Sequence, residues 1–164
     1  MGKHGRVELL VDELNAPEVY RRIHARNELT EMGTSATPML VRALREGSDR
    51  HRWEACKTLV TIKDPRAAPV LVESLRDEVM AVRWVAAEAL IALGDAAVNP
   101  LLHALEEHFE SVFLRESAHH VLWGLDHLGV LGPKGKELMV VLANSGPSIR
   151  VGVAAHEALV AQAH

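Results

Sequence analysis

The sequence predicts an all-α fold in which helix pairs stack side by side into one elongated superhelix. Three observations support this prediction. A segment that begins with Arg, has Ala three residues later and ends with Leu seven residues later occurs four times. The four arginines (Arg22, Arg52, Arg83 and Arg115) lie 30, 31 and 32 residues apart, a period typical of helical repeats. Aromatic residues make up only 4% of the chain while Ala, Leu and Val dominate, which favours helices packed through small side chains.

The elements follow from this period. The first helix, predicted over 5–14, has no partner before it, so we expect it to cap the array as a half-repeat. Apolar residues three and four positions apart then predict helix after helix, at 17–32, 36–46, 50–62, 66–77, 79–93, 96–108, 111–127, 134–144 and 147–162. We therefore expect about ten helices in about five pairs, forming a single domain over residues 1–164.

Proline and glycine mark the turns. The second helix of each pair begins near Pro38, Pro69, Pro100 or Pro133, and proline suits the first turn of a helix. The fourth repeat, about 111–144, is irregular because its first helix runs on into an extended turn that ends at Gly132. We interpret this turn as a tolerated insertion, since loops accept extra length at little cost. The C-terminal helix, about 147–162, also departs from the pattern.

Composition excludes several classes of function. The net charge is −4, with 22 acidic and 18 basic residues, which argues against a general nucleic-acid binder. No apolar run approaches 18 residues and no signal core follows the N-terminus, so a cytoplasmic protein without a membrane span is expected. The only cysteine, Cys56, excludes an intrachain disulfide and is expected to be buried.

Part of the repeat resembles a known family. The segment 82–95 (VRWVAAEALIALGD), followed by 98–105 (VNPLLHAL), resembles the bilin-lyase-type (PBS lyase) HEAT-like repeat, and 62–75 is similar to the second half of the same unit. The resemblance implies a right-handed superhelix whose second helices line a concave face. The family includes subunits of enzymes that attach bilin pigments to light-harvesting proteins, a di-iron deoxyhypusine hydroxylase and many scaffolds. A fold of this kind does not by itself indicate a function.

The hydroxylase interpretation is disfavoured by the residues at its ligand positions. In the resembling hydroxylase, His-Glu pairs just after the repeat arginine hold iron. Here those positions carry Ile23-His24, Trp53-Glu54, Trp84-Val85 and Glu116-Ser117. Weak metal candidates are Glu116, His119 and His120, which a helix places on one face. We predict no cofactor and no metal, and interpret these three residues as part of a solvated helix face.

Two sets of residues are candidates for binding a protein partner. Trp53 and Trp84 hold equivalent positions in adjacent repeats, so they are expected side by side, either as a hot spot or as a cover over the end of the core. The second helices present a mixed set of charges on the expected concave face, which is able to position a partner or simply to keep the surface soluble. The set comprises Arg42, Arg45, Glu73, Arg76, His103, Glu106 and Glu107.

The favoured function is thus a non-catalytic scaffold or adaptor that binds a protein. The sequence has neither a Gly-x-Ser-x-Gly nucleophile motif nor a phosphate-binding Gly-x-x-x-x-Gly-Lys loop. The alternatives are a bilin-lyase-like subunit or chaperone that presents a tetrapyrrole to a client protein, and a metal-dependent hydroxylase. A further alternative is local nucleic-acid binding through an arginine stripe of Arg42, Arg45, Arg50 and Arg52.

Overall fold

The computed structural model describes residues 2–144 and 147–163, so the predicted domain limits at 1 and 164 lie outside the described residues. Within them the chain forms ten α-helices and no strand, which confirms the predicted all-α solenoid. Helix ends agree with the predicted ranges to within three residues. The helices are α1 (Lys3–Glu13), α2 (Val19–Met32), α3 (Thr37–Glu46), α4 (Asp49–Ile62), α5 (Ala68–Ser74), α6 (Met80–Leu93), α7 (Val98–Glu107), α8 (Val112–His127), α9 (Pro133–Ala143) and α10 (Ile149–Gln162).

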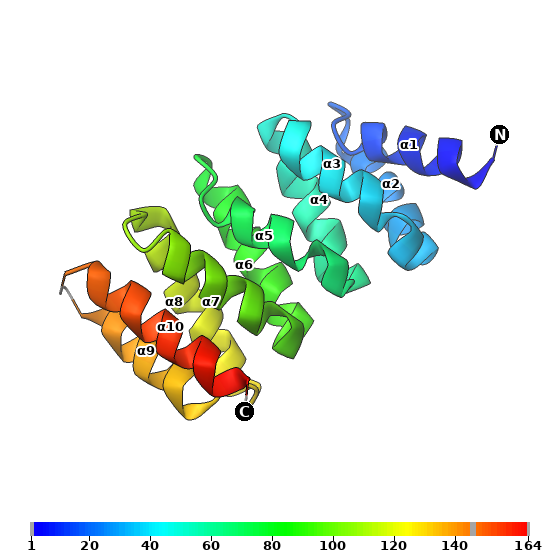
Figure 1. Cartoon of the computed structure of the whole chain (residues 1–164). Coiled ribbons are helices and arrows are strands. Elements are labelled where there is room, and N and C mark those ends of the chain that lie inside the picture. Colours follow the sequence, from blue (N-terminus) through cyan, green and yellow to red (C-terminus); the bar gives the residue numbers. More distant parts are fainter. Residues whose placement is uncertain (1, 145–146, 164) are drawn as a thin grey trace.

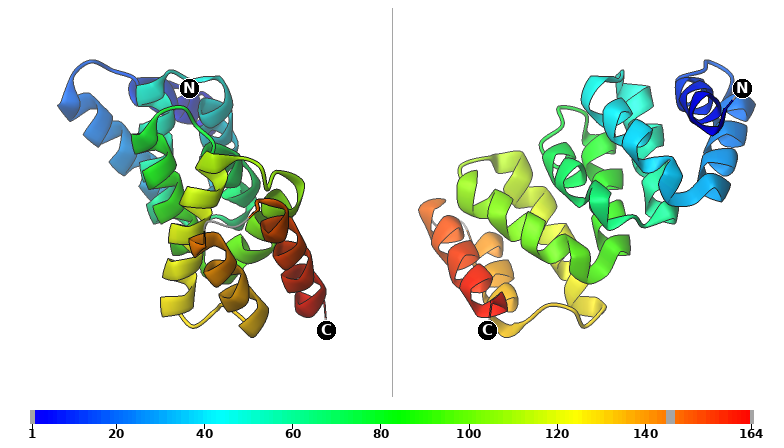
Figure 2. Two further views of the ribbon diagram at one scale, coloured as in Figure 1. Left: turned by 90° about the vertical axis from the view of Figure 1, so that its left-hand side faces the viewer. Right: turned by 45° about the vertical axis from the view of Figure 1, so that its right-hand side comes forward.

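The helices form two layers. One layer contains α1, α3, α5, α7 and α10, and the other contains α2, α4, α6, α8 and α9. Short 3₁₀ turns, η1 (Gly33–Ser35), η2 (Pro65–Ala67) and η3 (Gly94–Ala97), lead into α3, α5 and α7. Because each repeat packs mainly on its neighbours, the two ends of the chain lie at opposite ends of the stack (Figures 1 and 2).

The last two helices depart from strict alternation. The repeat period places the fourth second helix beside α7, but α9 instead packs on α8, and α10 takes the place beside α7. The turn between α8 and α9 contains Gly129 at a φ of 73° and the buried Leu131. Gly152 lets α10 approach closely, because a Cβ there would lie 2.8 Å from Cδ1 of Phe109. The extended turn thus has a structural consequence, since it carries α9 into the layer of first helices.

Small residues allow the first helices to pack closely. The repeated alanines and the leucines four residues after them have almost no solvent exposure, at Ala25, Ala55, Ala86, Ala118, Leu29, Leu59, Leu90 and Leu122. Cys56 is fully buried beside them. The core therefore forms one continuous cluster that runs through the repeats, as expected when no repeat buries its apolar face alone.

The repeated arginines stabilise the turns between repeats. Each donates from Nη1 to a backbone carbonyl five or six residues earlier, at distances of 2.8 Å for Arg22, Arg83 and Arg115 and 3.0 Å for Arg52. Hydrogen bonds from a charged donor are stronger than neutral ones, and these hold the chain where it turns into each first helix. The arginine that recurs about every 31 residues therefore has a structural role at each turn and does not mark a binding site.

One apolar stretch, Met80–Glu107, is long and apolar enough to span a membrane by length and composition alone. The stretch is not one straight helix, because Gly94 adopts a φ of 63° and ends α6. Its two limbs, α6 and α7, have 14 and 10 residues, fewer than the roughly 20 that a spanning helix needs. The hydrophobicity of this stretch is explained by its place in the core of the stack.

The turn before α5 contains a carboxylate that favours its charged form. Lys63 ends α4 in the left-handed conformation, and the buried Asp64 then caps η2 by accepting a hydrogen bond from the backbone N–H of Arg66. The Arg66 guanidinium also donates to Asp64 over 2.6 Å and to the Thr34 carbonyl over 2.8 Å. The hydrogen bond from Arg66 lowers the pKa of Asp64 to about 2.

This lowered pKa predicts a specific acid sensitivity. An unfolded Asp has a pKa near 3.9, so the ionised Asp64 stabilises the fold fully above about pH 4 and loses that contribution as the pH falls toward 2. We expect Asp64→Asn to be less stable than the wild type at pH 7, with the difference shrinking below pH 4. Urea unfolding between pH 7 and pH 2 measures this, and parallel pH profiles for the two proteins would contradict it.

Candidate protein-binding surfaces

The predicted binding residues divide between two layers of the structure. Arg42, Arg45, Glu73, Arg76, His103, Glu106 and Glu107 lie on or directly after α3, α5 and α7, in one layer. We call them the charged face. Trp53 and Trp84 lie on α4 and α6, in the other layer. The two sets therefore do not form one site, and a single small partner is not expected to contact both.

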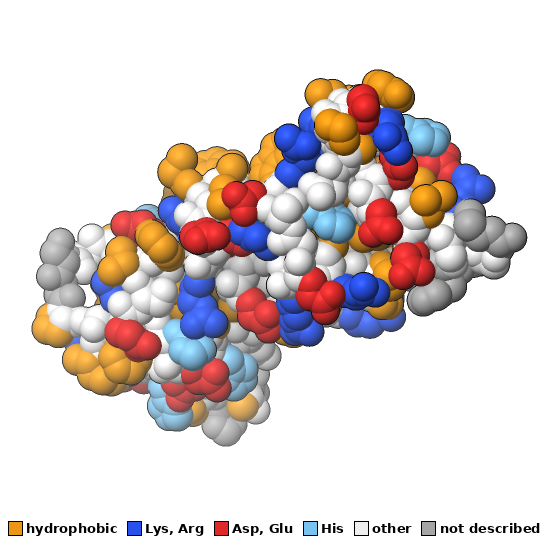
Figure 3. All heavy atoms as spheres, turned by 90° about the horizontal axis from the view of Figure 1, so that it is seen from above, with side chains coloured by type: hydrophobic (Ala, Val, Ile, Leu, Met, Phe, Trp, Pro, Cys, Tyr) orange, Lys and Arg blue, Asp and Glu red, His pale blue; other side chains and the backbone are white. Residues whose placement is uncertain are grey.

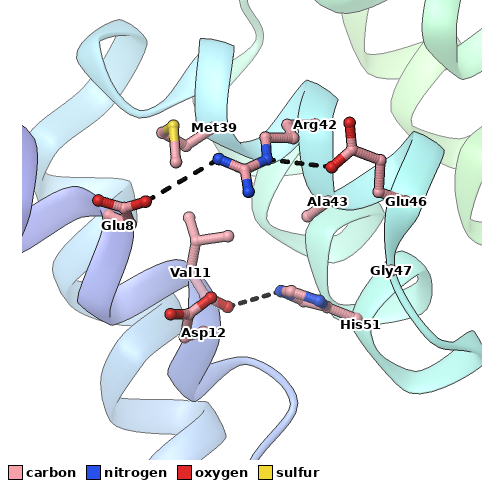
Figure 4. Close-up of a pocket in the computed structure, with 9 residues that line it drawn as sticks. All are labelled: Glu8, Val11, Asp12, Met39, Arg42, Ala43, Glu46, Gly47 and His51. Carbon is pink, nitrogen blue, oxygen red and sulfur yellow. Dashed lines mark hydrogen bonds and ion pairs between the residues drawn. The ribbon is translucent and has the colours of Figure 1, made fainter.

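The basic residues of the charged face are largely paired within the chain. Arg42 donates to Glu46 over 3.1 Å and lies 3.9 Å from Glu8, across the pocket between α1 and α3 (Figure 4). In the same way Arg45 pairs with Glu73 over 3.2 Å. Exposed pairs of this kind contribute little to stability. Seen from above, side chains of both signs are interspersed over the surface (Figure 3).

Glu106 on the charged face contacts one histidine of α10 and one of its own helix, α7. Nδ1 of His156 lies 2.7 Å from Oε1 of Glu106, and Nδ1 of His103 lies 3.9 Å from its Oε2. Glu106 is thus a contact between α7 and α10, which the repeat pattern did not predict because it placed α10 elsewhere. Beside it, an open groove between α5 and α7 has an apolar floor and a charged rim. Its lining includes Pro69, Val72, Arg76, Pro100, His103, Ala104 and Glu107.

The other layer carries a row of stacked rings on α6 and α8. Trp84 stacks on His120 with 4.6 Å between ring centroids, and Trp123 lies 4.0 Å from His127. His120 and Trp123 complete the row at 6.5 Å. We call these four residues the aromatic ladder. Trp84 is 58% exposed and Trp123 is 50% exposed, so the ladder presents two large apolar rings to solvent.

Trp123 was not among the site residues predicted from the sequence. Its signal was the spacing of His120, Trp123 and His127, which are three and four residues apart on one helix and therefore share one face. The contact with Trp84 was not predictable in this way, because it depends on how α6 and α8 cross. Gly124 sets that crossing, since a Cβ there would lie 2.5 Å from Cδ1 of Ile91.

The two predicted tryptophans have different environments. Trp53 is half-buried and packs against the core, and Nζ of Lys57 lies 4.1 Å from its ring centroid. Trp84 is instead largely exposed to solvent. Of the two alternatives considered for this pair, packing suits Trp53 and an exposed contact residue suits Trp84.

Comparison with known proteins places the chain in a family. A family model described as HEAT repeats matches residues 7–91, just over half of the chain, and one described as PBS lyase HEAT-like repeat matches residues 82–107. The chain belongs to the HEAT-repeat family. The second match confirms the resemblance inferred from residues 82–105. No curated protein sequence is significantly similar to the chain.

A solved structure extends this HEAT-repeat likeness over the full length. The complex of CpcE and CpcF of phycocyanin lyase from Nostoc sp. PCC7120 contains a chain that matches 95% of this chain over 99% of its own length. The TM-score is 0.63 and the sequence identity is 23%, so the likeness supports the fold and not the activity.

The weak metal candidates are separated on the surface of the HEAT array. His120 faces the α6 side, where its Nε2 lies 2.9 Å from Oε1 of Glu88. His119 lines a different groove, with Leu142 and Val151, and Glu116 borders both. Among the residues whose side chains the structure describes, no group of three or more His, Cys, Asp or Glu has a metal-binding arrangement.

Nucleophilic catalysis by Cys56 and nucleic-acid binding by the arginine stripe both have little support in this HEAT-repeat structure. Burial raises the pKa of the Cys56 thiol well above its usual range, and a thiol in this state is a poor nucleophile. In the arginine stripe, Arg52 donates to Asp77 over 2.6 Å and Arg42 and Arg45 have carboxylate partners. Phosphate binding would have to compete with these ion pairs.

Proposed function

We propose that this HEAT-repeat chain is a binding module that holds a protein partner on the outer surface of α6 and α8. The aromatic ladder is the observation that carries the proposal. Tryptophan is among the residues that most often dominate the binding energy of protein interfaces. The exposed tryptophans of the ladder also pack against neighbouring side chains. Trp84 stacks on His120, and Trp123 packs against His127 with the two rings tilted by 41°. These contacts limit the side-chain freedom that binding would remove.

A protein partner is also supported by the solved relative. That relative is a complex of two different chains, and the present chain matches one of its chains over nearly the whole length. The charged face carries side chains of both signs and offers a second surface that is able to orient a large partner. We propose no catalytic residue in this chain.

The ladder predicts a large effect on binding. The double variant Trp84→Ala/Trp123→Ala is expected to weaken partner binding at least about tenfold, because two exposed anchors are removed together. The measurement is capture of partners from an extract of the source organism, followed by determination of Kd for the captured protein. The matched control is Tyr20→Ala, which removes an aromatic ring that is 71% exposed on α2, away from the ladder. Equal retention of the partner by the double variant would refute the proposal.

A second candidate function is a bilin-lyase-like subunit that presents a tetrapyrrole to a client protein. Two observations favour it, namely the full-length likeness to a chain of a phycocyanin lyase complex and the row of alternating indole and imidazole rings, on which a planar pigment is able to stack. Titration with a free bilin tests it through the absorption spectrum. A saturable shift that the Trp84→Ala/Trp123→Ala variant lacks would support this function, and an unchanged spectrum would exclude the ladder as a pigment site.

A further inference from the structure

One tryptophan, Trp53, contacts a cationic side chain of the same chain. On α4, the ammonium of Lys57 lies over the Trp53 ring at 4.1 Å from the centroid. Lys57 is four residues after Trp53, so one turn of helix brings the cation to the ring. The contact is a cation–π interaction, in which the negative face of the indole attracts the positive charge.

The equivalent tryptophan on α6 lacks this internal cation. The residue four positions after Trp84 is Glu88, which holds the place of Lys57 in the repeat. Its carboxylate lies 2.9 Å from Nε2 of His120. The neighbouring Arg83 is engaged elsewhere, because its guanidinium lies 4.2 Å from the Phe113 ring centroid and donates to the Asp77 carbonyl. Trp84 thus combines high exposure with a carboxylate, that of Glu88, at the helix position where Trp53 has a cation.

A small pocket adjoins this ring. Its walls come from Met80, Arg83, Trp84 and Ala87 on α6 and from Glu116, Ser117 and His120 on α8. The walls are mostly apolar. The exposed Glu116 contributes a carboxylate, and the guanidinium of Arg83 is already held by the Phe113 ring and the Asp77 carbonyl. A ligand that fits such a pocket has an apolar stem and a cationic head. Arginine and lysine side chains have this form, since they bury their methylene groups and leave the charge at the surface.

We infer that the pocket beside Trp84 binds an arginine or lysine side chain from a basic segment of the protein partner. This inference rests on the proposed function and adds the chemistry of the partner. The guanidinium or ammonium stacks against the exposed part of the Trp84 ring, where Lys57 provides the internal precedent, and pairs with Glu116. Arginine suits the site best, because its planar head both stacks on aromatic rings and pairs with carboxylates. The net charge of −4 favours the approach of a basic partner.

A pair of peptides tests the inference on the full-length protein. The first is a short neutral peptide with one central arginine, and the second carries citrulline, a neutral analogue of the same shape, at that position. Binding is followed by NMR through the indole N–H of Trp84, identified as the resonance that Trp84→Phe removes. We expect a saturable shift with the arginine peptide and at least about fivefold weaker binding of the citrulline peptide.

Two variants of equal charge sharpen the test. Glu116→Gln is expected to weaken arginine-peptide binding several-fold, whereas Glu31→Gln, at an exposed position on α2, is expected to leave it unchanged. Equal binding of the two peptides would overturn the inference while leaving an apolar docking surface in place. Equal effects of the two variants would also overturn it, because they would indicate a general response to net charge. The capture experiment tests the proposed function separately. If the proposed function were wrong, the Trp84→Ala/Trp123→Ala variant would retain its partner in that experiment.

Discussion

Glu54→Ala is expected to lower the free energy of unfolding by about 2–3 kcal/mol. Glu54 on α4 is only 3% exposed, and it accepts hydrogen bonds from Arg22 over 3.2 Å and from Arg26 over 2.6 Å. Removing one partner of a buried ion pair typically costs about 3–5 kcal/mol, because the other charge remains without compensation. The expected loss is smaller here, because the side chains of Arg22 and Arg26 are 14% and 22% exposed to solvent.

Urea unfolding followed by circular dichroism measures this effect. The control is Glu46→Ala, which removes an exposed carboxylate that also pairs with an arginine, Arg42. Exposed pairs contribute little, so this variant is expected to unfold close to the wild type. Similar losses in the two variants would show that burial of Glu54 does not determine its contribution. The repeat arginine Arg22 would then hold its turn through its backbone bonds alone.

Ala86→Leu is expected to destabilise the protein by about 1–3 kcal/mol. Ala86 has no solvent exposure on α6, which packs against both α4 and α8. A leucine there has to displace neighbours that are already in contact, and over-packing of a well-packed core costs about that much. Thermal unfolding of Ala86→Leu beside Ala81→Leu measures it, because Ala81 is exposed on the same helix. An unchanged Tm in Ala86→Leu would show that the close contact at the repeated alanine is not required.

The two surfaces differ in how far they could be predicted. The residues of the charged face were predictable, because helical periodicity assigns positions such as Arg45 and Arg76 to the exposed side of their helices. Their pairing was not, since the contact of Arg45 with Glu73 joins neighbouring repeats. The aromatic ladder was predicted only at Trp84. Its extension through His120 and Trp123 depends on the close approach of α6 and α8, which Gly124 permits.

The sequence by itself determined the all-α class, the repeat period and the position of each helix to within three residues at its ends. These features depend on local preferences, which any short segment contains, and on a pattern repeated along the chain, which is visible once several repeats are aligned. Only the tertiary structure decided that α9 joins the layer of first helices and that α10 packs beside α7. That choice depends on side-chain volume across distant segments, such as Gly152 against Phe109. Contacts of this kind depend on which helices meet, and the repeat pattern at the irregular end of the array does not contain that information.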